Sequence, residues 1–380
     1  MGLGLINTQD TLIELCAHLD GQDWVALDTE FMREKTYFPQ LCLIQLATPD
    51  VVACVDPLAL PDLRPLMTAL YRPQLLKVLH SARQDQEIFF GLTGNPLAPV
   101  FDTQIAAALT GYDTNIGYAA LVKSITGIHL PKAHTRANWA ARPLAPGMLD
   151  YAADDVRHLR ALYTHFRQRL STLGRQQWLQ EDCERLTDPA LYENDPELAY
   201  LRIKKGHTLP PDKQPVLREL AAWRETTARQ HDLPRNWVVR DAILLELARA
   251  VPQTAAQLQH IPGLDKAVRA KWGVSLLAAI TRGQSAEPAR LWQQPHRMTP
   301  EEKRLRDEAL AEMETAAAEI GMTPAAIASR NDIKQLMLGN PPAALLQGWR
   351  YDIIGKALLA RRNNAAAAPG DDDNVVADER

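Results

Sequence analysis

Short apolar runs alternate with helical spacing over the first 200 residues of the chain. Runs rich in aliphatic and β-branched residues predict strands at residues 24–28, 41–46, 51–55 and 75–80. Short turns around Pro39 and around residues 48–50 separate the first three runs, which predicts an antiparallel meander. Apolar positions at helical spacing predict helices at residues 10–20, 62–71, 83–91, 103–109, 117–126 and 147–172. The two alternating patterns predict an α/β domain.

Breaker residues change the pattern between about residues 187 and 215, where Thr-Asp-Pro, Asn-Asp-Pro and Thr-Leu-Pro-Pro-Asp follow one another. Beyond this linker zone the apolar positions keep helical spacing and no convincing strand appears. A second helical block begins near Thr299-Pro300-Glu301-Glu302, whose Thr, Pro and Glu fit the N-cap, N1 and N3 positions of a helix. The similar lengths of the two helical blocks hint at a divergent tandem repeat.

The expected organisation therefore has four parts. Residues 1–200 form the α/β domain, residues 208–290 form a first all-helical domain, and residues 295–363 form a second. Residues 364–380 are rich in Ala and then in Asp, which predicts a disordered acidic tail.

Charge is spread unevenly over these parts, although the formal net charge of the whole chain is only −4. Residues 1–200 hold 16 basic and 24 acidic residues, residues 201–290 hold 15 and 8, and residues 291–380 hold 11 and 14. A middle segment with a net charge of +7 joined to an acidic body is typical of a nucleic-acid-binding module. A solvated basic helical face fits the charge equally well.

The remaining composition argues against several classes of protein. Four cysteines without a Cys-x-x-Cys pair speak against a disulfide framework or a structural zinc site. No stretch approaches the ~20 apolar residues of a membrane helix, and the first residues lack a basic start and an apolar run. We therefore expect a cytoplasmic protein with no membrane contact.

The sharpest local feature is Asp28-Thr29-Glu30, at the end of an apolar strand. A period of two places Asp28 and Glu30 on one face of the strand, where two anions repel each other unless a cation neutralises them. A polar strand end at the solvent boundary is the alternative. Asp85 follows the strand at 75–80 in the first turn of the next helix, where an acidic residue is also common as a capping group.

A third acidic element lies in the predicted helix 147–172, where Tyr151 and Asp155 are one turn apart on the same face. Taken together, these carboxylates suit a site for two divalent ions, Mg²⁺ or Mn²⁺, because hard cations prefer carboxylate oxygen. Two such ions about 3.5–4 Å apart can activate water and stabilise the leaving oxygen of a phosphodiester. Zinc is disfavoured because no His and Cys set has ligand spacing.

At these positions the chain resembles a known family. Asp28-Thr29-Glu30-Phe31 with residues 36–45, then His80-Ser81-Ala82-Arg83-Gln84-Asp85, and then Tyr151-Ala152-Ala153-Asp154-Asp155-Val156 are similar to the three exonuclease motifs of ribonuclease D. That family belongs to the 3′→5′ exonucleases named for their Asp-Glu-Asp-Asp residues, in the subgroup with Tyr in the third motif. The similarity extends through residues 101–104 and 142–144. Residues 217–225 with Leu233-Pro234 and Asp241 resemble the HRDC module, a helical nucleic-acid-binding domain, and residues 299–361 resemble a divergent second copy.

The resemblance implies a ribonuclease H-like mixed sheet with flanking helices, followed by two all-α HRDC-like domains. It implies that Asp28, Glu30, Asp85 and Asp155 are the metal ligands, and that Tyr151 hydrogen-bonds the attacking water. The expected activity is 3′→5′ exoribonuclease hydrolysis that releases nucleoside 5′-monophosphates, with tRNA precursors as substrates and no obligate protein partner. A 3′→5′ DNA exonuclease and a non-catalytic RNA-binding scaffold are the alternatives.

Further residues are weaker candidates. Lys132, Arg136 and Trp139 mix cations with an aromatic, which suits phosphate contact and base stacking but also suits a charged surface loop with one packed Trp. We expect Asp102 to cap the helix that begins at Thr103. His80 fits either a core histidine or a phosphate contact, and two tryptophans of the basic block, Trp223 and Trp237, are expected in its core.

Overall fold

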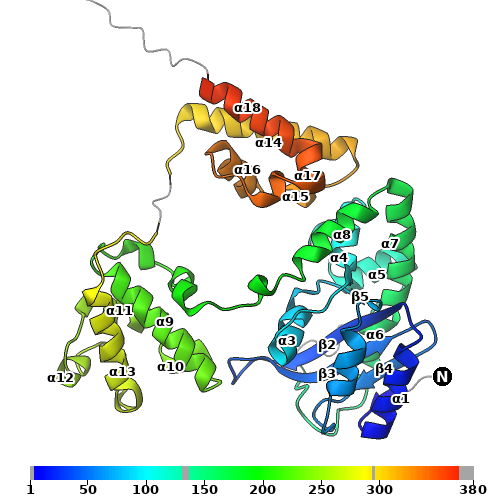
Figure 1. The fold of residues 1–380 in the computed structure, drawn as a ribbon, viewed down its shortest axis with the longest axis horizontal. Helices are drawn as coiled ribbons and strands as arrows, with labels where there is room; N and C mark the ends of the chain where they lie inside the picture. The colour runs from blue at the N-terminus through cyan, green and yellow to red at the C-terminus, as the bar shows by residue number, and fades with distance from the viewer. Residues whose placement is uncertain (1–3, 131–136, 293–295, 368–380) are drawn as a thin grey trace, which may run out of the picture.

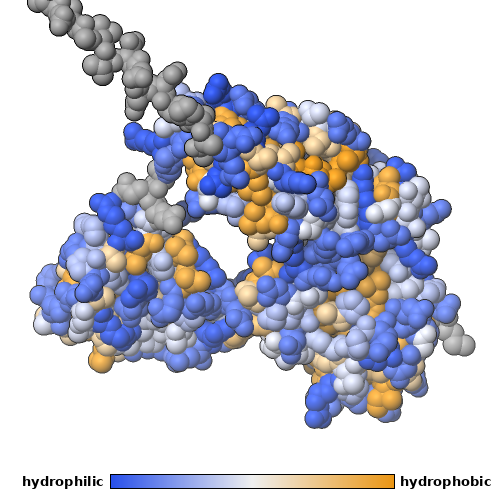
Figure 2. Space-filling view, turned by 45° about the horizontal axis from the view of Figure 1, so that its top comes forward, coloured by the Kyte–Doolittle hydropathy of each residue, from blue (hydrophilic) through white to orange (hydrophobic). Residues whose placement is uncertain are grey.

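The computed structural model describes residues 4–130, 137–292 and 296–367. An α/β domain comes first, and two helical blocks follow it along the chain (Figure 1). The space-filling view shows an open space between the first helical block and the rest of the molecule (Figure 2). No helix of the described residues is long and apolar enough to cross a membrane.

A six-stranded mixed sheet with the order β1-β4-β3-β2-β5-β6 forms the centre of the α/β domain. Strands β2, β3 and β4 pair antiparallel, which confirms the predicted meander, and β1, β5 and β6 join it through parallel pairs. The strands are β1 (Gly4–Ile6), β2 (Trp24–Met32), β3 (Gln40–Ala47), β4 (Val52–Val55), β5 (Leu76–Leu79) and β6 (Val100–Asp102). The long central strand β2 therefore carries the acidic motif in the middle of the domain.

The two outer strands, β1 and β6, were not predicted from the sequence. Each has only three residues, too few to show a period of two. Their partners define them: β1 pairs with β4, and β6 pairs with β5.

Helices cover both faces of the sheet and bury different side chains of β2. Val25 and Leu27 pack into one cluster together with α1 (Gln9–Leu19), α2 (Arg64–Leu70) and α3 (Arg83–Thr93). Ala26 faces the other side and packs into the cluster that includes α4 (Thr103–Leu109), α5 (Tyr118–Thr126) and α7 (Leu159–Leu173).

Helix α6 (Met148–Arg157) packs across β2, β3 and β4, and α8 (Gln176–Arg185) packs against β6. Asp28 lies on the Ala26 face by strand alternation, so the acidic motif faces α6.

The predicted helix at 147–172 is two helices, α6 and α7, which are interrupted at His158. The Tyr118 hydroxyl donates to the carbonyl of Asp154, 2.9 Å away. In an unbroken helix that carbonyl accepts from the amide four residues later, which is His158. The periodicity of 147–172 could not show this interruption, because a single-residue break preserves the apolar face on both sides.

Short 3₁₀ turns occupy the predicted linker zone, at η1 (Pro189–Leu191), η2 (Pro196–Arg202) and η3 (Gly206–Thr208). The first helical block then packs around its own apolar core, to which η2 also contributes. Its helices are α9 (Gln214–Gln230), α10 (Arg235–Val238), α11 (Asp241–Ala250), α12 (Ala255–Leu258) and α13 (Lys266–Ser285).

The second helical block begins with a capping box at Thr299 and Glu302, as the sequence predicted. Its elements are α14 (Pro300–Glu319), α15 (Pro324–Ile327), α16 (Arg330–Met337), η4 (Ala343–Leu345), α17 (Gly348–Arg350), η5 (Tyr351–Gly355) and α18 (Lys356–Ala367). Helix α18 runs past the expected start of the tail at residue 364, since alanine has the highest helix propensity. The tail from residue 368 onward lies outside the described residues.

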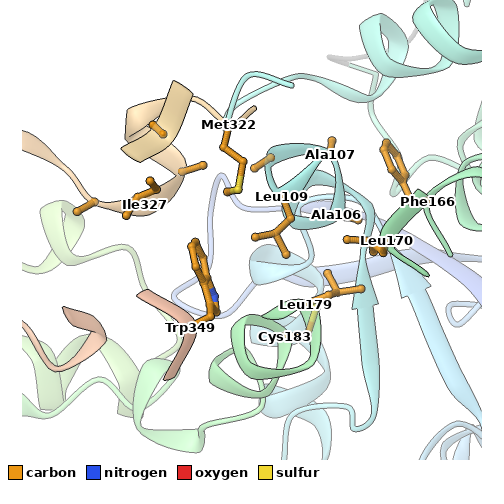
Figure 3. Close-up of a cluster of buried hydrophobic side chains, with 14 of the residues drawn as sticks. Ala106, Ala107, Leu109, Phe166, Leu170, Leu179, Cys183, Met322, Ile327 and Trp349 are labelled. Atoms are coloured by element: carbon orange, nitrogen blue, oxygen red, sulfur yellow. The ribbon is translucent and has the colours of Figure 1, made fainter. Parts of the chain in front are cut away.

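The second block shares one hydrophobic cluster with the α/β domain. Met322 and Trp349 from the block pack with Leu109, Leu179 and Cys183 of the α/β domain (Figure 3). Because a single core crosses this boundary, the second block and the α/β domain should unfold together.

Polar contacts fix the orientation of this shared interface. The rings of Trp178 and Trp349 stack with centroids 4.7 Å apart. The Arg350 guanidinium pairs with the Asp182 carboxylate and also donates to the carbonyls of Ala326 and Ile327. These charge-assisted contacts anchor α17 on α8.

Substitution Trp349→Ala is expected to lower the free energy of unfolding of the whole chain by about 3–5 kcal/mol, because it empties a site in the shared core. Urea unfolding followed by circular dichroism measures the change. The exposed Trp237 provides the matched control, and Trp237→Ala should change stability by less than about 0.5 kcal/mol. A separate early transition of the second block, with the main transition unchanged, would show that the cores are independent.

Candidate active site

Asp28 and Glu30 lie on one face of β2, and both side chains are half-buried. The β2–β3 register shifts between Glu30 and Phe31, so that β3 has one extra residue, Cys42, at this point. Bulges of this kind are common beside active sites, where they redirect neighbouring side chains. The Arg142 guanidinium holds this bulge by donating to the Cys42 carbonyl.

Asp85 lies in the first turn of α3 and is only 6% exposed. The Thr29 hydroxyl donates to the Asp85 carboxylate over 2.5 Å, which ties α3 to the acidic motif of β2. Asp102 supports the same corner, because its carboxylate accepts from the backbone amides of Ser81 and Ala82. It also caps α4 by accepting from the amide of Gln104, so the expected capping role of Asp102 is confirmed.

Asp155 and Tyr151 lie on α6, the helix that packs across the acidic face of the sheet. The Tyr151 ring is 6.2 Å from the ring of Trp139, centroid to centroid. Two helices that are distant in sequence, α3 and α6, therefore place their acidic residues beside those of β2.

Burial raises the pKa of all four carboxyl groups, and the charges of other members of the cluster raise it further at Asp28 and Glu30. Burial is the largest cause in each case. The pKa of Glu30 rises to about 8, and those of Asp85 and Asp155 rise to about 7. The pKa of Asp28 rises well above its usual value, with contributions from the charges of Asp85, Asp155 and Glu30. The pKa of Asp28 therefore responds to the charges of all three other carboxylates.

All four charged groups of this cluster are carboxylates. Hard divalent cations prefer carboxylate oxygens as ligands, so the cluster fits such a cation. Within the described residues, no three acidic, His or Cys side chains already converge as a closed ligand cage. Mg²⁺ does not require one, since it is usually held by one or two carboxylates, water and substrate phosphate.

Gln45 is a second observation that fits a polar ligand here. It pairs directly with Asp28 across the β2–β3 ladder, so its side chain lies on the same face of the sheet. It is fully buried, and neither atom of its amide has a hydrogen-bond partner. An unsatisfied buried amide costs about 1–3 kcal/mol. The Gln45 amide beside Asp28 therefore has hydrogen-bonding capacity that no protein group uses.

The expected RNA contacts differ from the structure at one position. Trp139 is only 3% exposed and packs in a cluster with Met148 and the edge of β3. It is therefore not available for base stacking, and the alternative of a packed Trp is correct. Lys132 and Arg136 lie outside the described residues.

His80 is held as a structural residue. One ring nitrogen lies 2.9 Å from the Thr103 hydroxyl and the other lies 3.1 Å from the Ile116 carbonyl. Burial lowers the pKa of His80, which favours the neutral ring. Both nitrogens have protein partners, so the core interpretation of His80 is correct.

Three residues around the site were not identified from the sequence: Thr29, Gln45 and Tyr118. A lone Gln inside the apolar strand 41–46 was a usable signal for a buried polar group. The roles of Thr29 and Tyr118 depend on packing between distant elements and leave no local pattern.

Comparison with known proteins agrees with this geometry. A family model described as 3′-5′ exonuclease matches residues 4–171, and a model of the HRDC domain matches residues 213–280. Ribonuclease D of Granulibacter bethesdensis is 38% identical over 94% of this chain and 92% of the relative. Ribonuclease D of Nitrobacter hamburgensis is 35% identical over 100% of both.

A solved structure, that of RNase D from Escherichia coli, an exoribonuclease involved in structured RNA processing, superposes with a TM-score of 0.83. It is 30% identical and covers 95% of this chain and 98% of its own. The mixed sheet, the acidic cluster and the matched models define a 3′→5′ exonuclease. The chain belongs to the ribonuclease D family, and its activity is that of a 3′→5′ exoribonuclease.

Repulsion within the cluster gives a prediction for Asp155→Asn. In metal-free wild-type protein the carboxyl pKa values are raised, so the folded state holds more protons than the unfolded state, and stability should fall as pH rises from about 4 through about 8. Removing the Asp155 charge should raise the thermal midpoint at pH 8 by a few degrees and should weaken the pH dependence.

The measurement is differential scanning calorimetry with chelator, then with Mn²⁺. The exposed Asp150 on the same helix gives the control, Asp150→Asn, which should show neither effect. A lower midpoint for Asp155→Asn without metal would contradict the repulsion account, as would an undiminished Mn²⁺-induced stabilisation.

Proposed function

We propose that Asp28, Glu30, Asp85 and Asp155 hold two divalent ions, Mg²⁺ or Mn²⁺, at which the 3′-terminal phosphodiester of RNA is hydrolysed. Exonucleases of this class depend on divalent metal. The observation that carries the proposal is the set of four neighbouring carboxylates with raised pKa values, which a bound cation would lower. Bound ions would lower the pKa of the attacking water and stabilise the leaving oxygen.

The residues take different roles in this proposal. Asp28 feels the charge of all three other carboxylates, which supports a position between the two ions. Thr29 orients Asp85 through its hydroxyl. Tyr151 orients the attacking water with its phenol, and the products are nucleoside 5′-monophosphates.

The first helical block supplies the surface that captures the body of the RNA. Its segment carries a net charge of +7, whereas the α/β domain is acidic. Trp237 was expected in the core of this block, but α10 has only one turn and presents the side chain outward, 57% exposed. Arg229 and Arg240 are exposed in the same block. An exposed aromatic among cations suits base stacking with phosphate contact.

The substrates that we propose are precursors of tRNA, which the enzyme trims at the 3′ end in the cytoplasm. A structured RNA body with a short single-stranded 3′ extension matches a basic helical surface combined with an acidic hydrolytic site. Lys132 and Arg136 would contact phosphates near the 3′ end.

Digestion of 5′-labelled RNA and DNA oligonucleotides of one sequence tests the activity. With Mg²⁺ the RNA should shorten stepwise from its 3′ end, and chelator should stop the reaction. Asp28→Ala should lower the trimming rate by far more than the ~10–100-fold that is typical when a residue that only orients a metal ligand is changed. Asp62, which is half-buried and pairs with Arg64, provides a control because no observation links it to the acidic cluster, and Asp62→Ala should keep full activity. Near wild-type trimming by Asp28→Ala would exclude the metal site, and faster trimming of DNA would favour a DNA exonuclease.

Substitution Trp237→Ala tests the capture surface. Loss of one stacked base costs about 1–3 kcal/mol, so KM for a tRNA precursor with a short 3′ extension should rise roughly 5-fold to 150-fold. KM for a short unstructured oligonucleotide should stay unchanged. Val274 is an exposed apolar residue of the same block, and Val274→Ala serves as the control. Equal effects of Trp237→Ala on both RNAs would contradict a separate capture surface.

A further inference from the structure

The side chain of Tyr118 forms a hydrogen bond with the backbone of the helix that carries Asp155. Tyr118 lies at the first position of α5, and its hydroxyl donates to the backbone carbonyl of Asp154 over 2.9 Å. The backbone amide of His158 also lies beside this hydroxyl and acts to lower its pKa. In a regular helix the Asp154 carbonyl and the His158 amide bond each other. The phenol therefore stands between two backbone groups that are normally partners.

This insertion coincides with the end of α6. Helix α6 stops at Arg157, and α7 starts at Leu159. A side chain inserted into the backbone ladder is one of the recognised causes of a sharp change of helix direction. Helix α6 can then follow β2, β3 and β4, while α7 packs on α4 and α5. The last turn of α6, whose position is set in this way, contains Asp155.

Tyr118 is itself held in place from the opposite side of the site. Its ring lies 5.6 Å from the ring of His80, centroid to centroid. His80 follows β5, and both of its ring nitrogens have protein partners, the Thr103 hydroxyl and the Ile116 carbonyl. His80 also begins the loop that leads to Asp85. Tyr118 thus connects the corner that bears Asp85 with the helix that bears Asp155.

The phenol also lies near the carboxylates without being one of the acidic groups. The charges of Asp155 and Asp28 raise its pKa, after burial as the main cause. The hydroxyl therefore keeps its proton at any working pH and remains a donor to the Asp154 carbonyl.

We propose that Tyr118 is a positioning residue for the metal site: its hydroxyl holds the interruption between α6 and α7 and thereby aims the Asp155 carboxylate at Asp28. This inference rests on the proposed function, in which Asp155 is a metal ligand. Without the hydroxyl, the Asp154 carbonyl and the His158 amide bond each other, and the end of α6 turns toward the axis of α7. Asp155 then leaves its place beside Asp28.

Substitution Tyr118→Phe removes only the hydroxyl. Isothermal titration of the full-length protein with Mn²⁺ should show affinity reduced roughly 10–100-fold, the range found when a group that orients a metal ligand is lost. KM for a short RNA oligonucleotide should be unchanged, while the Mn²⁺ concentration for half-maximal rate should rise by the same factor. Tyr71 is half-buried and also donates its hydroxyl to backbone carbonyls, those of Phe89 and Asn95, which are not part of α6. Tyr71→Phe should therefore leave Mn²⁺ affinity unchanged.

Equal Mn²⁺ affinity in wild type and Tyr118→Phe would overturn the inference, and so would a loss of stability with Mn²⁺ affinity retained. Failure of the wild-type protein itself to bind Mn²⁺ would instead sink the proposed metal-dependent function.

Substitution His158→Pro tests the interruption while keeping the Tyr118 hydroxyl in the chain. Proline lacks the amide hydrogen and breaks a continuous helix, but it is tolerated where a helix is already interrupted. The variant should therefore fold and bind Mn²⁺ as the wild type does. Loss of the fold or of Mn²⁺ binding in His158→Pro would overturn the proposal. It would show that the protein needs the helical hydrogen bond from the His158 amide to the Asp154 carbonyl.

Discussion

Repulsion among four carboxylates at one point of the sheet is the constraint on which the active site depends. Burial raises the pKa of each group, and the charges of neighbouring carboxylates raise the pKa values of Asp28 and Glu30 further. The fold opposes that repulsion with a hydrogen bond from the Thr29 hydroxyl to Asp85 and with the packing of α6 across the strands. The Asp102 carboxylate holds the loop before α3 through backbone amides, although its charge adds to the repulsion on Asp85. A site built in this way is unfavourable when empty and favourable when a cation enters it.

The two helical blocks contact the α/β domain through different kinds of interaction. The second block shares a hydrophobic core with α4, α7 and α8, as an element does within one domain (Figure 3). The first block meets the β2–β3 hairpin through polar contacts, in which the Tyr37 hydroxyl donates to Glu225 and the Asp232 carboxylate accepts from the amides of Tyr37 and Phe38. Tyr37 also packs against the apolar core of the first block, so this contact is only partly polar. The first block nevertheless has a core of its own, whereas the second block shares one with the α/β domain.

The sequence predicted most elements whose pattern is local and repeated. The meander followed from long apolar runs and short turns, and Asp28 with Glu30 followed from a period of two. Trp237 was misjudged, since it was expected in a core and is exposed, and the sequence left open whether Trp139 is packed or stacks on bases, whereas the structure shows it buried. A tryptophan in a one-turn helix or a loop has no periodicity to show which way it faces. Tyr118 could not be found either, because nothing in its neighbourhood shows that it enters another helix.

The central claim is that the repulsion among Asp28, Glu30, Asp85 and Asp155 exists to receive divalent cations. Diffraction from crystals grown with Mn²⁺, recorded at a wavelength where manganese scatters anomalously, tests this most directly. The account predicts two anomalous peaks about 3.5–4 Å apart among these carboxylates, with Asp28 touching both. Crystals that retain RNA-trimming activity with Mn²⁺ but show no manganese at these residues would contradict it.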